Sequence, residues 1–163
     1  CLKYTYMNGD NMAVVGVVIG SNSDLETIQG TINVLTDLGI SHELSVISAH
    51  RTPEKAREYG LSAEDRGIEV IIAAAGGSAA LPGVMSSWSN VPVIGIPLAA
   101  SELKGIDALY SIAQMPPGIP VACVSIGSWG TRNAAYLAAS ILSLKYPDIK
   151  AAYVAYRTKL ASG

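Results

Sequence analysis

Short apolar segments with the pattern of buried strands alternate with segments of helical periodicity along almost the whole chain. In the first helical segment, apolar residues recur every three or four positions until Gly39, a typical helix stop. Such alternation with short connections predicts a doubly wound α/β sandwich whose sheet is mainly parallel. The expected strands cover residues 14–19, 43–48, 70–74, 92–96 and 121–126. The expected helices cover residues 25–38, 53–66, 79–88, 105–114, 131–144 and 149–160.

A five-stranded sheet favours a flavodoxin-like three-layer sandwich over a full dinucleotide-binding Rossmann domain. With 163 residues the chain suits a single domain, which we expect to span residues 13–163. We expect residues 1–12 to form a flexible N-terminal extension, because the patterned chain starts at Ala13. The two cysteines make no disulfide framework, and Cys123 in its apolar run is typical of a small buried hydrophobe.

Composition narrows the classes of partner. Half of the residues are hydrophobic and 15% are charged, yet the apolar runs are too short to cross a bilayer. So little polar surface on so apolar a chain predicts burial between subunits, and hence a homo-oligomer. The net charge of −2 provides no basic surface, which argues against a nucleic-acid partner. No apolar leader segment is visible at the start, so we expect a cytoplasmic location.

A polar corner over residues 48–53 (Ser-Ala-His-Arg-Thr-Pro) joins an expected strand to an expected helix. Thr52 as N-cap and Pro53 at the first helical position favour a helix start there. Ligands of open α/β sheets bind at this carboxyl edge. His50 offers a proton shuttle and Arg51 a permanent cation for an anion. The alternative is a polar turn whose His binds a backbone carbonyl, and one His alone does not decide between the two.

A second loop at the same edge, residues 20–24 (Gly-Ser-Asn-Ser-Asp), opens a helix. Its free amides and the hydroxyls of Ser21 and Ser23 suit a phosphate, and Asp24 could accept hydrogen bonds from ribose hydroxyls. The alternative is that Ser23 or Asp24 is simply the N-cap. The glycine spacing matches neither a P-loop nor a G-x-G-x-x-G fingerprint, which disfavours ATP and NAD.

The third loop covers residues 75–83 and contains Gly76 and Gly77. Paired glycines let backbone amides approach a flat ligand or a small anion, although a tight turn without ligand is the competing interpretation. No cluster of His, Cys or carboxylates has metal-ligand spacing, so no metal is expected. We expect His42 in an exposed loop and Trp88 and Trp129 as packing anchors.

Four stretches, in order and spacing, resemble the PurE family of purine-biosynthesis enzymes, the N5-carboxyaminoimidazole ribonucleotide mutases. This family is also called the catalytic subunit of phosphoribosylaminoimidazole carboxylase. The stretches are residues 20–24, residues 48–53, residues 75–77 with Leu-Pro-Gly at 81–83, and Ser-Ile-Ala-Gln-Met-Pro at 111–116. The similarity runs from about Val14 to about Leu144, nearly the whole expected domain.

The resemblance implies a flavodoxin-like subunit in a homo-octamer and a reaction without metal or organic cofactor. In that reaction a carboxylate moves from the exocyclic nitrogen of an aminoimidazole ribonucleotide, a small-molecule substrate, to ring carbon C4. By matching positions, the resemblance implies that His50 is the general acid/base. It implies a substrate pocket formed by Ser21, Ser23, Asp24, Ser48, Arg51, Gly76 and Gly77.

Some residues bear on the choice between a mutase, a direct carboxylase, a binding module and a flavin carrier. The bacterial mutase pattern usually has His directly before Leu-Pro-Gly, where this chain has Ala80, so full activity and the choice between mutase and direct carboxylation by CO2 stay open. The animal-type carboxylases typically have Lys where this chain has Arg51, so Arg51 favours the mutase. A non-catalytic nucleotide-phosphate binding module would need residues 20–24 and Arg51 but has no use for His50. A flavin electron carrier is disfavoured, because residues 20–24 are a poor flavin-phosphate loop.

Overall fold

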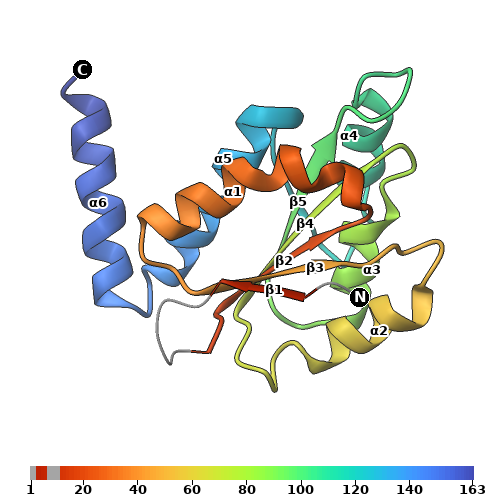
Figure 1. Ribbon diagram of the computed structural model, residues 1–163, viewed down its shortest axis with the longest axis horizontal. Coiled ribbons are helices and arrows are strands. Elements are labelled where there is room, and N and C mark those ends of the chain that lie inside the picture. Colours follow the sequence, from red (N-terminus) through yellow and green to blue (C-terminus); the bar gives the residue numbers. More distant parts are fainter. Residues whose placement is uncertain (1–2, 7–11) are drawn as a thin grey trace.

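The computed structural model describes residues 3–6 and 12–163, and over these residues a six-stranded sheet lies between two layers of helices (Figure 1). The strands are β1 (Lys3–Tyr6), β2 (Val15–Ile19), β3 (His42–Val46), β4 (Val70–Gly76), β5 (Val93–Leu98) and β6 (Ala122–Cys123). The helices are η1 (Asn22–Asp24), α1 (Leu25–Asp37), α2 (Pro53–Ser62), α3 (Ala80–Trp88), α4 (Ile106–Ala113), α5 (Gly127–Leu142) and α6 (Pro147–Ala161).

The strand order of the sheet is β1-β3-β2-β4-β5-β6. All neighbours from β3 to β6 pair in parallel, in the order that a flavodoxin-like fold requires, so the predicted fold class is confirmed. β1 adds an antiparallel edge, with Lys3 opposite Ser45 and Tyr6 opposite His42. The expected flexible extension over residues 1–12 thus contains a strand, while its residues 1–2 and 7–11 lie outside the described residues.

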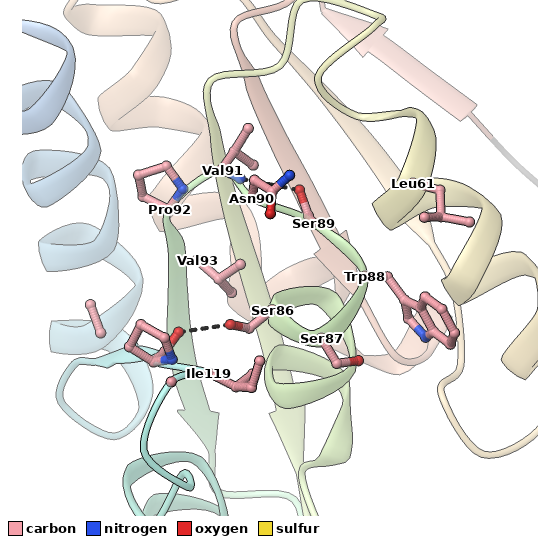
Figure 2. A pocket seen from close by; sticks show the side chains of 13 residues that line it. Leu61, Ser86, Ser87, Trp88, Ser89, Asn90, Val91, Pro92, Val93 and Ile119 are labelled. Carbon is pink, nitrogen blue, oxygen red and sulfur yellow. Dashed lines mark hydrogen bonds between the residues drawn. The ribbon is translucent and has the colours of Figure 1, made fainter.

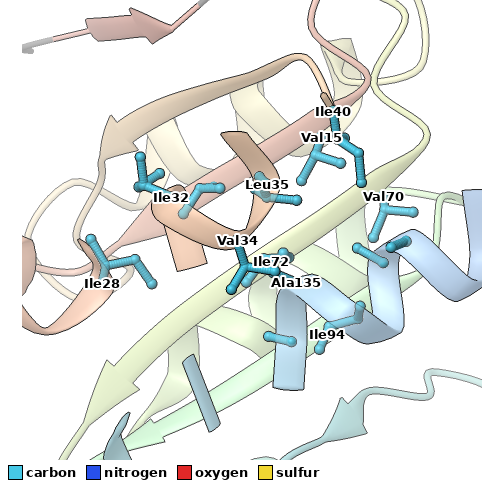
Figure 3. Close-up of a cluster of buried hydrophobic side chains, with 14 of the residues drawn as sticks. Val15, Ile28, Ile32, Val34, Leu35, Ile40, Val70, Ile72, Ile94 and Ala135 are labelled. Atoms are coloured by element: carbon cyan, nitrogen blue, oxygen red, sulfur yellow. The ribbon is translucent and has the colours of Figure 1, made fainter. Parts of the chain in front are cut away.

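Both faces of the sheet are covered, because side chains alternate between the two faces along each strand. In β2, Val15, Val17 and Ile19 belong to the cluster under α1 and α5, whereas Val18 belongs to the cluster on the opposite face. Figure 3 shows Val15 in the first of these clusters, near Leu35 and Ile40. The helices over that opposite face are α2, α3 and α4, as their buried residues show. A strand buried on both faces has to be apolar at every position, which explains the continuous hydrophobic runs of the sequence.

Most predicted elements are confirmed within a few residues, but the last strand and the helix after it differ. β6 has two residues instead of the predicted six, and α5 begins at Gly127 rather than residue 131. The first turn of α5 lies very close to the chain that enters it, since a Cβ on Gly130 would lie 1.7 Å from the carbonyl oxygen of Ser125.

α6 leaves the sandwich and packs along α5 (Figure 1). The rings of Tyr136 in α5 and Tyr156 in α6 stack with centroids 4.3 Å apart. At the corner between the helices, Glu69 accepts hydrogen bonds from Lys145 (2.6 Å) and Tyr146 (2.5 Å). Within the described part of the chain, no helix combines the length and the apolar character needed to cross a bilayer.

The expectations for four side chains are wrong. His42 is 2% exposed in β3, because a neighbouring strand covers β3 on each side. Its Nδ1 lies 2.8 Å from the carbonyl oxygen of Ile40. Trp129 is 71% exposed at the start of α5, and Trp88 is 39% exposed, so neither anchors the core. Cys123 is half-buried rather than fully buried.

Candidate active site

The loops after β2, β3 and β4 meet at the carboxyl edge of the sheet around a cavity of about 440 Å³. The cavity lies where the chain reverses its direction across the sheet, the position at which open α/β sheets bind ligands. All predicted site residues line it. They are Ser21, Ser23, Asp24, Ser48, His50, Arg51, Gly76 and Gly77.

In the first loop, the Ser21 hydroxyl organises the turn. Ser21 is the N-cap of η1, and its Oγ accepts hydrogen bonds from the backbone N–H of Ser23 (3.3 Å) and from the Ser23 hydroxyl (3.0 Å). Asp24 occupies the N-cap position of α1 without a side-chain capping bond. Neither Ser23 nor Asp24 therefore serves as a side-chain cap, and the capping alternative does not account for their presence.

Partial burial raises the pKa of the Asp24 carboxyl, because leaving water penalises its charged form. Weaker opposing effects come from the backbone of Ser21, the hydroxyl of Ser23 and the positive charge of Arg51. The ligand-free fold therefore holds a carboxylate in a place that is unfavourable for it. A ligand with hydrogen-bond donors would relieve that cost.

Replacing Asp24 by Asn is expected to raise the Tm of the ligand-free protein near neutral pH. A carboxyl whose pKa is raised on folding loses stability as the pH rises from its unfolded value of 3.8 through its folded value, and Asn escapes this loss. Thermal melts over a pH series should show the advantage of the variant growing through that window and then levelling off. An advantage that instead shrinks with rising pH would contradict the burial argument.

In the second loop, Arg51 ties two loops together. Its backbone N–H and its Nε each donate to the hydroxyl of Ser48 at 3.2 Å, and its Nη2 donates to the carbonyl of Gly20 at 3.3 Å. The guanidinium thus stands beside the first loop with its position fixed from two sides. Thr52 stabilises the same corner, since its hydroxyl donates to the carbonyl of Ser48 at 3.0 Å instead of capping α2.

His50 is exposed at the rim of this cavity. Among the residues that the structure describes, none makes a hydrogen bond to its ring, so the alternative of a His bound to a backbone carbonyl does not hold. A ring without a structural partner can turn toward a bound ligand and exchange a proton with it.

The third loop brings backbone close to the cavity. A Cβ on Gly76 would lie 2.6 Å from the Cβ of Ala100, and Gly77 has a φ of +62°, so both positions favour glycine. Ala79 is also left-handed at φ +39°, and its N–H donates to the carbonyl of Gly76 at 3.1 Å. A strained alanine beside a cavity is typical of a functional loop.

The small apolar residues of the second and third predicted loops line the cavity as well, namely Ala49, Ala75, Ala79, Ala80 and Leu81. Ala100 lies outside the three predicted loops and was missed. Alanine carries no chemical signature of a site, and the usable signal was that Ala100 follows a buried strand at the same edge of the sheet. We call Ala75, Ala79, Ala80 and Ala100, which line this cavity, its small-residue wall.

A larger cavity of about 670 Å³ lies at the opposite edge, where β5 and β6 begin (Figure 2). Trp88, Leu61 and a set of serines, prolines and small apolar residues line it, and none of its lining residues is titratable. This cavity therefore lacks side chains that could transfer a proton or bind a charged ligand. Of these two cavities, only the smaller one is lined by titratable side chains.

Comparison with known proteins agrees with this geometry. The family model described as AIR carboxylase matches residues 14–162, which is nearly the whole chain. The chain belongs to the AIR carboxylase family. Within that family, it is 54% identical over 146 residues to the N5-carboxyaminoimidazole ribonucleotide mutase of Pyrococcus abyssi, covering 90% of this chain and 83% of the relative.

Two further matches extend the family relation. The mutase of Thermotoga maritima is 48% identical over 149 residues, covering 91% of this chain and 86% of the relative. The crystal structure of Treponema denticola PurE superposes with a TM-score of 0.81 at 31% identity, covering 91% of both chains. The resemblance to the PurE family, predicted from four short stretches, is thereby confirmed.

Proposed function

We propose that this chain is an N5-carboxyaminoimidazole ribonucleotide mutase of purine biosynthesis. The observation that carries the proposal is the convergence of His50, Arg51 and the loop of Ser21, Ser23 and Asp24 on one cavity, in a member of the AIR carboxylase family. The relatives bearing this name, in Pyrococcus abyssi and Thermotoga maritima among others, support it. The substrate is a small molecule, and the reaction needs neither metal nor organic cofactor.

Substrate binding uses the first two loops. Arg51 and the hydroxyls of Ser21, Ser23 and Ser48 hold the phosphate, since fixed cations and hydroxyl donors suit a phosphate group. Asp24 accepts hydrogen bonds from ribose hydroxyls, which offsets the burial of its carboxylate. Gly76 and Gly77 admit the flat imidazole ring close to the backbone.

His50 moves the proton. In its protonated form it donates to the exocyclic nitrogen while the bond between that nitrogen and the carboxyl carbon breaks, which releases CO2. Carbon C4 of the electron-rich ring then attacks the CO2 and forms the new carbon–carbon bond. Neutral His50 finally removes the proton from C4 and restores the aromatic ring, so the enzyme returns to its starting protonation state.

CO2 has to stay in the cavity between the two steps. The small-residue wall that includes Ala75, Ala79, Ala80 and Ala100 leaves room for it beside the ring. Retaining the CO2 keeps the two half-reactions intramolecular, an entropic advantage that escape into solvent would remove.

The test supplies each candidate substrate separately, with and without bicarbonate, and follows the C4-carboxylated product. The mutase should convert the N-carboxylated nucleotide without added bicarbonate. Product formed only from aminoimidazole ribonucleotide with bicarbonate would show a direct carboxylase instead. This alternative is tested because Ala80 stands where the bacterial mutase pattern usually has His. Nucleotide binding without turnover on either substrate would leave a non-catalytic binding module.

Assembly and location complete the proposal, namely a homo-octamer in the cytoplasm. The projecting helix α6, which exposes Val154 and Leu160, and the exposed Leu103, Ile106 and Trp129 supply apolar surface that a neighbouring copy could cover. Light scattering should return eight times the 16.9 kDa mass of one chain. A monomeric mass would contradict the proposed octamer but would leave the proposed reaction unaffected.

A further inference from the structure

Helix α4 lines no part of the cavity, yet one of its hydroxyls reaches the cavity wall. The Ser111 hydroxyl donates a hydrogen bond to the backbone carbonyl of Ser78, in the loop between β4 and α3. The two residues are 33 positions apart, so the contact joins separate elements. Ser78 stands between Gly77, which lines the cavity, and Ala79, which also lines it.

The loop that Ser111 contacts is the one whose backbone most needs support. Gly77 and Ala79 flank Ser78 in left-handed conformations, with φ values of +62° and +39°. An alanine adopts this conformation only where its surroundings over-determine it. Ala79 is 3% exposed, so packing holds its side chain, and the Ser111 bond fixes the carbonyl just before it.

A second contact shows that α4 faces the same wall one turn earlier. Asp107 accepts a hydrogen bond of 2.5 Å from the hydroxyl of Ser101, in the loop after β5. Next to Ser101 in that loop is Ala100, which lines the cavity and packs so closely on Gly76 that no Cβ would fit between them. Two polar side chains of α4, four residues apart, therefore anchor the two loops that form the small-residue wall.

We propose that Ser111 is a positioning residue of the active site, and this proposal rests on the function proposed above. Its hydroxyl fixes the backbone of Gly77, Ser78 and Ala79, and through them the space beside the imidazole ring that CO2 occupies. Ser111 itself touches no substrate, because it lies outside the cavity lining. Its loss should therefore disturb the reacting end of the site more than the phosphate end, which residues 20–24 and Arg51 hold.

The experiment compares Ser111→Ala with Ser111→Thr and with a matched control, Ser86→Ala. Ser86 also donates its hydroxyl to a backbone carbonyl of a distant segment, that of Pro120 at 2.8 Å, but in the cavity at the opposite edge (Figure 2). The two serine contacts thus have the same chemistry and differ in their distance from the site. For each variant, kcat and KM for the N-carboxylated nucleotide and hydrogen exchange of the amides at residues 77–79 are measured.

Ser111→Ala should lower kcat about tenfold with KM changed less than about threefold, below the hundredfold that a displacement of roughly 1 Å can cost. Its amides at residues 77–79 should exchange faster than in the wild type. Ser111→Thr, which keeps the hydroxyl, should restore kcat to within about threefold, and Ser86→Ala should match the wild type. Kinetics and exchange of Ser111→Ala equal to those of Ser86→Ala would overturn the proposal.

The two proposals fail separately. An inactive wild-type protein would refute the mutase function, and the exchange of residues 77–79 would still decide whether Ser111 fixes the loop. An active wild type with an unaffected Ser111→Ala variant would refute only the positioning role. A rise in KM alone, with kcat unchanged, would also refute it, because the effect would then lie at the phosphate end.

Discussion

Replacing His50 by Asn is expected to lower kcat at least about a hundredfold, because a positioned general acid/base contributes roughly that much. Asn retains a polar side chain of similar size but cannot exchange a proton near neutral pH. KM should change little, since the phosphate-binding groups lie in residues 20–24 and Arg51. Steady-state assays on the N-carboxylated nucleotide measure both constants.

Fold and binding controls make the His50 result specific. His50 is exposed and has no hydrogen-bond partner on its ring among the described residues, so His50→Asn should melt within a degree or so of the wild type. Titration with the product nucleotide should give a Kd within about threefold of the wild-type value. Turnover retained within about tenfold would refute the catalytic assignment and favour a site that only binds.

Among Gly→Ala substitutions in this chain, Gly130→Ala is expected to lower the free energy of unfolding most. Its Cβ would lie 1.7 Å from the oxygen and 2.8 Å from the carbon of the Ser125 carbonyl, both backbone atoms. That backbone cannot retreat easily, because the preceding residue, Val124, donates its N–H to the carbonyl of Gly95 in the sheet at 3.0 Å. Overpacking of this kind costs about 3 kcal/mol, or about 10 °C in Tm for a chain of this size.

Gly20→Ala is the matched control for this stability effect. A Cβ on Gly20 comes no closer than 3.9 Å to another group, the Oδ2 of Asp24, which is ordinary contact. Thermal and urea unfolding at one fixed protein concentration should leave Gly20→Ala within about 0.5 kcal/mol of the wild type. Equal stability of the two alanine variants would show that the turn before α5 relaxes freely.

The five parallel strands and the helices between them could be predicted because their signals are local. A strand buried on both faces is continuously apolar, and a helix over a sheet repeats its apolar residues at three and four positions. The three polar loops followed from the topology, since the carboxyl ends of parallel strands meet at one edge. His50, Arg51 and Asp24 therefore came together as predicted.

What could not be predicted depends on contacts between distant segments. The burial of His42 depends on the strands that cover β3 on both sides, and the outermost of them, β1, lies in the unpatterned first residues. The contact of Ser111 with the carbonyl of Ser78 arises only when α4 is placed over the loop after β4, so residues 111–116 contributed to the resemblance without revealing this contact.

The two borders of the sheet also bear on how the newly made chain avoids aggregation. Long, flat borders with free backbone groups recruit strands from other molecules and seed fibres. Here one border, β6, offers only two residues of ladder before the chain turns away into a helix, and the other is the four-residue antiparallel strand β1. We therefore expect this fold to resist edge-to-edge polymerisation even at the high concentrations of a crowded cell.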